Sequence, residues 1–83
     1  MTKTEINLRP LLPLDRISAA LVAQTASHFE ARLTIEQEGM VLNLKSMLGL
    51  LSQPDFGDGI ATLVANGEDE KEASEAILSL FRK

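Results

Sequence analysis

The sequence predicts an α+β fold with the element order β-α-β-β-α-β-α, in which a four-stranded antiparallel sheet carries three helices on one face. Two stretches alternate apolar and polar residues, as half-buried strands do, and two further apolar stretches bounded by turn residues complete the set of strands. Between and after them, apolar residues recur at helical spacing. Strands covered on one face and helices with one apolar stripe pack best as a two-layer sandwich.

The first strand is expected over Thr4–Arg9, where the alternation runs until Pro10 begins an irregular connection. From Asp15 to His28 the period changes, and the apolar residues form one helical stripe: Ala19, Val22, Ala23, Ala26 and Phe29. Asp15 and Ser18 are both candidate N-caps. We favour Asp15, because a carboxylate at that end gains from the cap and from the helix dipole.

The second half of the chain continues with a hairpin, a short helix, a strand and a final helix. Glu38-Gly39 supplies the turn of the hairpin. The expected elements are the hairpin strands Arg32–Glu36 and Met40–Asn43, a helix starting at Ser46, a loop over Gln53–Gly59, a strand over Ile60–Ala65, and a helix within Glu68–Lys83 with the stripe Ala73, Ala76, Ile77 and Leu80.

Length and composition limit the possible functions. The 83 residues fit one domain, residues 1–83, and the absence of cysteine excludes disulfides and thiolate metal sites. No apolar run is long enough for a membrane span or a signal segment, so we expect a cytoplasmic protein. A net charge of −4 and only three aromatic residues, all Phe, argue against direct nucleic-acid binding and favour a protein partner.

The stretch around Ser46 is the main candidate for function. Ser46 begins a short apolar helix, where its oxygen accepts a backbone hydrogen bond and where the helix dipole would stabilise a phosphate. The residues that follow are too large and too many for one short helix to bury, so some should face solvent: Met47, Leu48, Leu50 and Leu51. Two interpretations stay open, an ordinary capped core helix and a phosphorylation site beside a docking patch.

Several stretches resemble the HPr family, the histidine-containing phosphocarriers of the bacterial sugar phosphotransferase system. They are Gln24-Thr25-Ala26-Ser27, Gly39 in the hairpin, Asn43-Leu44-Lys45-Ser46-Met47-Leu48-Gly49 with Ser52, and Gly67-Glu68-Asp69-Glu70 with Glu72-Ala73. The resemblance implies an HPr-like open-faced sandwich over nearly the whole chain. The stretch at Ser46 is similar to the segment that the ATP-dependent HPr kinase/phosphorylase modifies, and this favours the phosphorylation interpretation.

The chain differs from the family pattern at the phosphorylated histidine. Where the family has Gly-Leu-His-Ala-Arg-Pro, this chain has Pro13-Leu14-Asp15-Arg16-Ile17-Ser18, so Asp15 stands at the histidine position and Ile17 replaces the arginine. A phosphocarrier needs a neutral imidazole and a cationic neighbour. We therefore expect no histidine phosphotransfer. An acyl phosphate on Asp15 would need a metal or a cationic cluster that the sequence does not supply, whereas the permanent charge of Asp15 could mimic phosphohistidine in part.

The resemblance to Crh-like members, which lack the active histidine and keep the serine, implies a regulator of carbon catabolite repression that is not an enzyme and holds no cofactor. Its implied partners are HPr kinase/phosphorylase and a LacI-type catabolite repressor, although Ile17 removes an arginine that contributes to the repressor contact in the family. The residues expected at the partner surface are Lys45, Met47, Leu48, Leu51, Asp15 and Arg16, with Ser46 as the phosphorylated residue.

Two alternatives remain. The chain could dock on phosphotransferase-system proteins through Met47, Leu48 and Leu51 without relaying phosphate, or it could be an HPr fold with an unrelated binding role. His28, the only histidine, is expected to be a surface cap at the end of the first helix. Four acids are expected to stabilise the start of the last helix and not to bind metal: Glu68, Asp69, Glu70 and Glu72.

Overall fold

The structure, a computed structural model, describes residues 1–11, 15–52 and 58–81. The sheet is formed by β1 (Thr2–Asn7), β2 (Arg32–Gln37), β3 (Met40–Asn43) and β4 (Ile60–Asn66). The helices are the 3-10 helix η1 (Arg9–Leu11), α1 (Arg16–Ser27), α2 (Met47–Ser52) and α3 (Glu70–Leu80). The observed order is therefore the predicted β-α-β-β-α-β-α, with η1 added.

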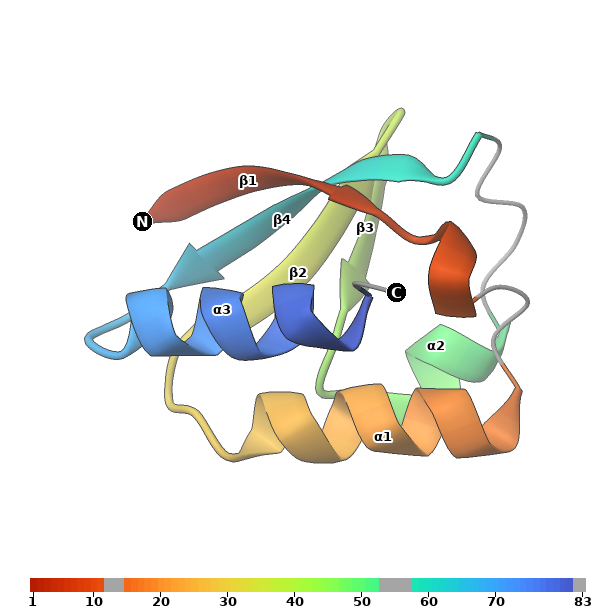
Figure 1. Ribbon diagram of the computed structural model, residues 1–83, viewed down its shortest axis with the longest axis horizontal. Coiled ribbons are helices and arrows are strands. Elements are labelled where there is room, and N and C mark those ends of the chain that lie inside the picture. The colour runs from red at the N-terminus through yellow and green to blue at the C-terminus, as the bar shows by residue number, and fades with distance from the viewer. Residues whose placement is uncertain (12–14, 53–57, 82–83) are drawn as a thin grey trace.

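The four strands form one antiparallel sheet in the order β1-β4-β2-β3. Helices α1, α2 and α3 lie on the same side of this sheet, as Figure 1 shows, and the predicted α+β sandwich is confirmed. The β2–β3 hairpin turns at Glu38 and Gly39, whose φ angles are 45° and 84°. Two positive φ angles in a two-residue turn match the right-handed twist of the paired strands.

The core lies between the sheet and the helices. Alternate residues of the central strands point into it, so that Leu33 and Ile35 of β2 and Leu63 of β4 are almost fully buried. The helices contribute the predicted stripes, because Ala19, Val22, Ala23 and Ala26 of α1 and Ala73 and Ile77 of α3 are buried against the same cluster. Small residues on α1 let that helix pack closely against α3 and α2.

The first strand begins and ends two residues earlier than the sequence predicted. The alternation over Thr4–Arg9 correctly predicts which side chains are buried, since Ile6 and Leu8 lie in the core. However, the Asn7 side-chain oxygen accepts a hydrogen bond from the Arg9 N–H, at 3.1 Å, and the chain turns there into η1. The prediction that the strand reaches Arg9 is therefore wrong, because a side-chain bond competes with the sheet at that point.

The other predicted elements agree within about two residues, as expected for helix and strand ends. The last helix runs from Glu70 to Leu80, within the predicted range of Glu68–Lys83. Three predicted segments lie outside the described residues in whole or in part: the connection at 12–14, the loop at 53–57 and the chain end at 82–83.

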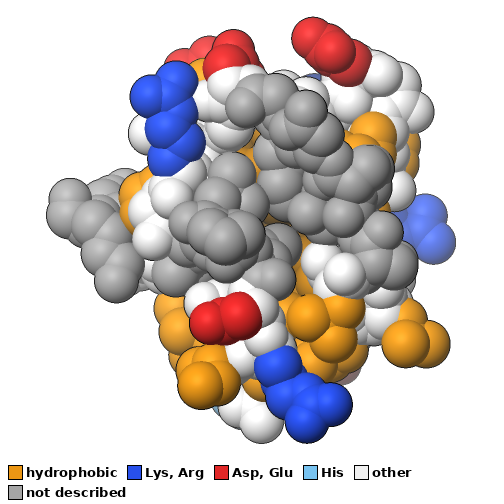
Figure 2. All heavy atoms as spheres, turned by 90° about the vertical axis from the view of Figure 1, so that its right-hand side faces the viewer, with side chains coloured by type: hydrophobic (Ala, Val, Ile, Leu, Met, Phe, Trp, Pro, Cys, Tyr) orange, Lys and Arg blue, Asp and Glu red, His pale blue; other side chains and the backbone are white. Residues whose placement is uncertain are grey.

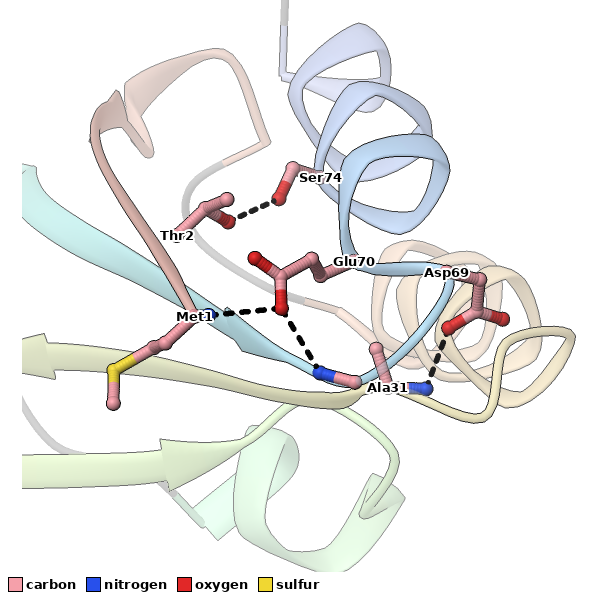
Figure 3. Close-up of polar contacts among 7 residues, drawn as sticks. Met1, Thr2, Ala31, Asp69, Glu70 and Ser74 are labelled. Atoms are coloured by element: carbon pink, nitrogen blue, oxygen red, sulfur yellow. Dashed lines mark hydrogen bonds and ion pairs between the residues drawn. The ribbon is translucent and has the colours of Figure 1, made fainter.

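The turn between β4 and α3 joins distant parts of the chain, as Figure 3 shows. The Asp69 carboxylate accepts hydrogen bonds from the backbone N–H groups of Glu30 and Ala31, at 2.9 and 2.8 Å. One oxygen of Glu70 accepts from the Gly67 N–H at 3.2 Å and lies 3.0 Å from the ammonium group of Met1. These acids were predicted to stabilise the start of their own helix. Asp69 and Glu70 in addition hold segments that lie far away in the sequence.

The same turn makes the stability of the fold dependent on pH. The hydrogen bond from the Glu30 N–H, followed by that from Ala31, lowers the pKa of Asp69, and the bond to the Met1 ammonium group lowers the pKa of Glu70. A carboxylate with a lowered pKa in the folded state stabilises the fold above its unfolded pKa, and this contribution is lost as the pH falls through the folded pKa.

We therefore expect the free energy of unfolding to fall as the pH drops from about 5 through the acid range. Urea unfolding at a series of pH values, on the wild type and on the double variant Asp69→Asn/Glu70→Gln, measures this dependence. The variant should show a shallower loss of stability in acid. Equal slopes for the two proteins would contradict the assignment to Asp69 and Glu70.

Candidate functional site

Ser46 lies at the start of α2 and caps it, as predicted. Asn43 stabilises the turn that precedes Ser46. Its side-chain oxygen accepts a hydrogen bond from the Lys45 N–H at 2.9 Å, and its backbone carbonyl accepts one from the Ser46 N–H at 3.1 Å. The Ser46 hydroxyl oxygen then accepts from the Gly49 N–H at 3.1 Å. The helix cap orients this oxygen, and Ser46 as a whole residue is only partly buried.

Gly49 lies directly beside the Ser46 hydroxyl. A Cβ atom at position 49 would lie 3.4 Å from the Ser46 oxygen, at the edge of ordinary van der Waals contact. Glycine is a poor residue inside a helix, since it costs about 1 kcal/mol relative to alanine. Here its missing side chain leaves room beside the one hydroxyl that the sequence singled out.

The residues after Ser46 divide between core and solvent. Leu50 is 1% exposed and belongs to the core, while Leu48 is 81% and Leu51 43% exposed. Met47 is partly buried and packs against the core cluster. The prediction that some of these side chains face solvent is confirmed. We call Met47, Leu48 and Leu51 the α2 apolar patch.

Helix α1 adds exposed hydrophobic surface, part of which the sequence did not predict. Ile17 is 80% and Leu21 45% exposed, and one helical turn separates them. Leu21 could have been noticed, because it lies off the buried stripe of its helix. Figure 2 shows the end of the molecule where α1 begins and α2 lies, with hydrophobic side chains gathered in the lower part beside acidic and basic side chains.

Asp15 caps α1, and this prediction is confirmed. Its side chain accepts from the Ser18 N–H at 2.7 Å, and this bond is the main reason why the pKa of Asp15 is lowered. The carboxylate is therefore ionised at neutral pH. Asp15 and Arg16 are both exposed, and among the residues that the structure describes the only ion pair is the one between Met1 and Glu70.

The Lys45 side chain, which was expected at the partner surface, is held by a hydrogen bond within the chain. Its ammonium group donates to the carbonyl oxygen of Phe29 at 2.7 Å, which joins the start of α2 to the end of α1. Lys45 and Met47 line one side of an open groove of about 570 Å³, and Ser27 and His28 line the other. His28 is the exposed C-terminal cap of α1, where its backbone N–H bonds the Thr25 carbonyl at 3.2 Å.

Two kinds of site find no support in the described parts of the chain. No three His, Asp or Glu side chains within residues 1–11, 15–52 and 58–81 come together as a metal site would require. Over the same residues, no helix is long and apolar enough to cross a membrane.

Comparison with known proteins identifies the family. The model of the family described as the PTS HPr component phosphorylation site matches residues 14–83. The chain belongs to the HPr family. This match includes both Asp15 and Ser46, and it agrees with the resemblance seen in the sequence.

Among curated proteins, this HPr-family chain is similar to the HPr-like proteins Crh of Bacillus subtilis and Halalkalibacterium halodurans. It is 35% identical to the former over its full length and 98% of that protein. It is 32% identical to the latter over its full length and 99% of that protein. Among solved structures, HPr-C-His from Thermoanaerobacter tengcongensis superimposes with a TM-score of 0.85, at 32% identity, over 98% of this chain and 91% of that one.

Proposed function

We propose that this HPr-family protein is a regulator in carbon catabolite repression, phosphorylated at Ser46 by an HPr kinase/phosphorylase. The single observation that carries the proposal is Ser46, a partly buried residue whose hydroxyl caps the start of α2, with Leu48 81% exposed two residues away. The similarity to Crh over the full chain supports the regulatory role. In this proposal residues 1–83 act as one HPr-like domain in the cytoplasm, as a substrate and not an enzyme.

The proposed reaction uses ATP as the donor. The Ser46 oxygen attacks the γ-phosphorus of ATP, the bond from that phosphorus to the β–γ bridging oxygen breaks, and ADP leaves. The hydroxyl proton passes to a base of the kinase. The product phosphate then lies at the positive end of α2, where backbone N–H groups favour negative charge.

Asp15 gives the reason for excluding phosphate relay in this proposal. The Ser18 N–H holds Asp15 as the N-cap of α1, and an acyl phosphate on Asp15 would need a metal ion or a cationic cluster that the sequence near it does not supply. The charge of Asp15 instead stands permanently where a phosphohistidine would be charged only transiently. We infer that Asp15 mimics that state in part, since one carboxylate has less charge than a phosphate.

The phosphorylated protein is proposed to bind a LacI-type catabolite repressor through Ser46 and the α2 apolar patch. Arg16 is exposed at the start of α1, and the next residue, Ile17, offers hydrophobic surface where the family pattern has a cation. A second candidate function follows from the same exposed surface. The α2 apolar patch of Met47, Leu48 and Leu51 would let the chain dock on phosphotransferase-system proteins without relaying phosphate.

Incubation with a cognate HPr kinase and ATP, followed by intact-mass measurement, tests the proposal. The wild type should gain one phosphoryl group and Ser46→Ala none. Ser18→Ala is the matched control, because it removes a hydroxyl from the first turn of α1 instead and should leave the gain unchanged. A wild type that stays unmodified would refute the proposal and favour the docking function.

A further inference from the structure

Lys45 connects the residue next to it, Ser46, with a distant segment. Its backbone N–H is held by the Asn43 side chain at 2.9 Å, which fixes the chain just before Ser46. Its ammonium group, 2.7 Å from the Phe29 carbonyl oxygen, reaches the connection between α1 and β2. One side chain therefore ties the start of α2 to residues 29–31.

Residues 29–31 are also held from the other side. The Asp69 carboxylate accepts the N–H groups of Glu30 and Ala31, and Figure 3 shows the second of these bonds. The charge of the Lys45 ammonium group is one of the smaller causes that lower the pKa of Asp69, so the two groups act on each other across this connection. Ala31 is fully buried, and its amide should open to water only when these restraints loosen.

We propose that Lys45 is a positioning residue that transmits the phosphorylation state of Ser46 to the connection at Phe29–Ala31. This inference rests on the proposed modification of Ser46. A phosphate there carries a charge of about −1.5 to −2 at neutral pH. It attracts an adjacent ammonium group more strongly than the neutral carbonyl of Phe29 does.

The consequence is a local loosening. When the ammonium group turns toward the phosphate, the Phe29 carbonyl loses its donor and Asp69 loses part of its favourable electrostatic surroundings. The N–H groups of Glu30 and Ala31 then open more often, while the centre of the sheet stays closed. The end of α1, which leads into this connection, thus reports whether Ser46 is modified.

Amide hydrogen exchange followed by NMR tests this coupling on the full chain. Phosphoserine is placed at position 46 during chemical synthesis, so that no kinase is needed. The amides of Glu30 and Ala31 should exchange at least about fivefold faster than in the unmodified chain, the size expected when one hydrogen bond is lost. The Ile35 amide in β2 is the internal reference and should not change.

The variants separate the role of Lys45 from a general effect of charge. Lys45→Met should accelerate exchange at Ala31 without any phosphate, and adding phosphoserine to that variant should produce no further change. Lys71→Met, which removes an exposed cation from α3, is the matched control and should behave as the wild type. Lys45→Arg keeps the cation and should preserve the response to phosphoserine.

Two results would overturn the inference: an unchanged exchange rate at Ala31 on phosphorylation, or an equal acceleration with and without Lys45. Because the phosphate is installed chemically, either result leaves the kinase assay on Ser46 untouched. Conversely, a kinase that ignores Ser46 would refute the proposed function without altering the exchange data.

Discussion

Gly67→Ala should destabilise the protein by about 3 kcal/mol, because a side chain at position 67 has no room. A Cβ atom there would lie 2.6 Å from the Cα atom and 3.0 Å from the Cβ atom of Ala31. Ala31 is fully buried and its N–H is held by Asp69, so the obstructing atoms cannot move without breaking the turn that holds α3 against the end of α1. In a chain of this size such a loss lowers the Tm by roughly 10 °C or more.

Gly39→Ala is the control for this substitution. Gly39 has a φ of 84°, but a Cβ atom there would meet no atom within 4 Å. The cost should be only the backbone strain, about 1 kcal/mol. Chemical denaturation of the two variants measures the difference. Equal losses would mean that backbone conformation, and not the contact with Ala31, dictates glycine at position 67.

Leu48→Asp should reduce kcat/KM of the HPr kinase for this protein about thirtyfold, equivalent to roughly 2 kcal/mol of a central contact. Leu48 is 81% exposed, so the substitution should leave the fold intact. A carboxylate placed two residues after Ser46 removes the hydrophobic contact and adds negative charge where the proposed product is also negative. Initial rates at several concentrations of the protein measure the effect.

Val41→Asp provides the matched comparison for Leu48→Asp. Val41 is 61% exposed on β3, where it lines an open surface of the sheet together with Lys3, Arg32 and Thr34. The same change from an aliphatic side chain to a carboxylate should leave the kinase kinetics unchanged there. If both variants lost activity equally, the α2 apolar patch would have no special role and the effect would follow from net charge alone.

The sequence was sufficient for those features that depend on local pattern. The stripe of α1, the cap at Asp15, the turn at Glu38-Gly39 and the cap at Ser46 each follow from residues within a few positions of one another. The same local logic predicted that part of the apolar run after Ser46 would face solvent. These features were predictable because helix caps and tight turns use side chains close in sequence.

Features that depend on backbone atoms far away in sequence were not predictable. Lys45 was expected at a partner surface, but its ammonium group bonds the carbonyl of Phe29, and a carbonyl has no signature in the sequence. Asp69 was expected to support its own helix, yet its side chain makes no cap bond there and holds Glu30 and Ala31 instead. Neither contact can be inferred before the start of α2 and the β4–α3 turn are placed beside the connection that follows α1.

The choice of phosphoryl donor tests the central claim most directly. The wild-type protein is incubated in one vessel with enzyme I and phosphoenolpyruvate and in another with HPr kinase and ATP, and the modified residue is located by tandem mass spectrometry. We predict no phosphoryl group from phosphoenolpyruvate and one phosphoryl group from ATP, on Ser46. A phosphoryl group from phosphoenolpyruvate on Asp15 or His28, or one from ATP at any residue other than Ser46, would contradict the account.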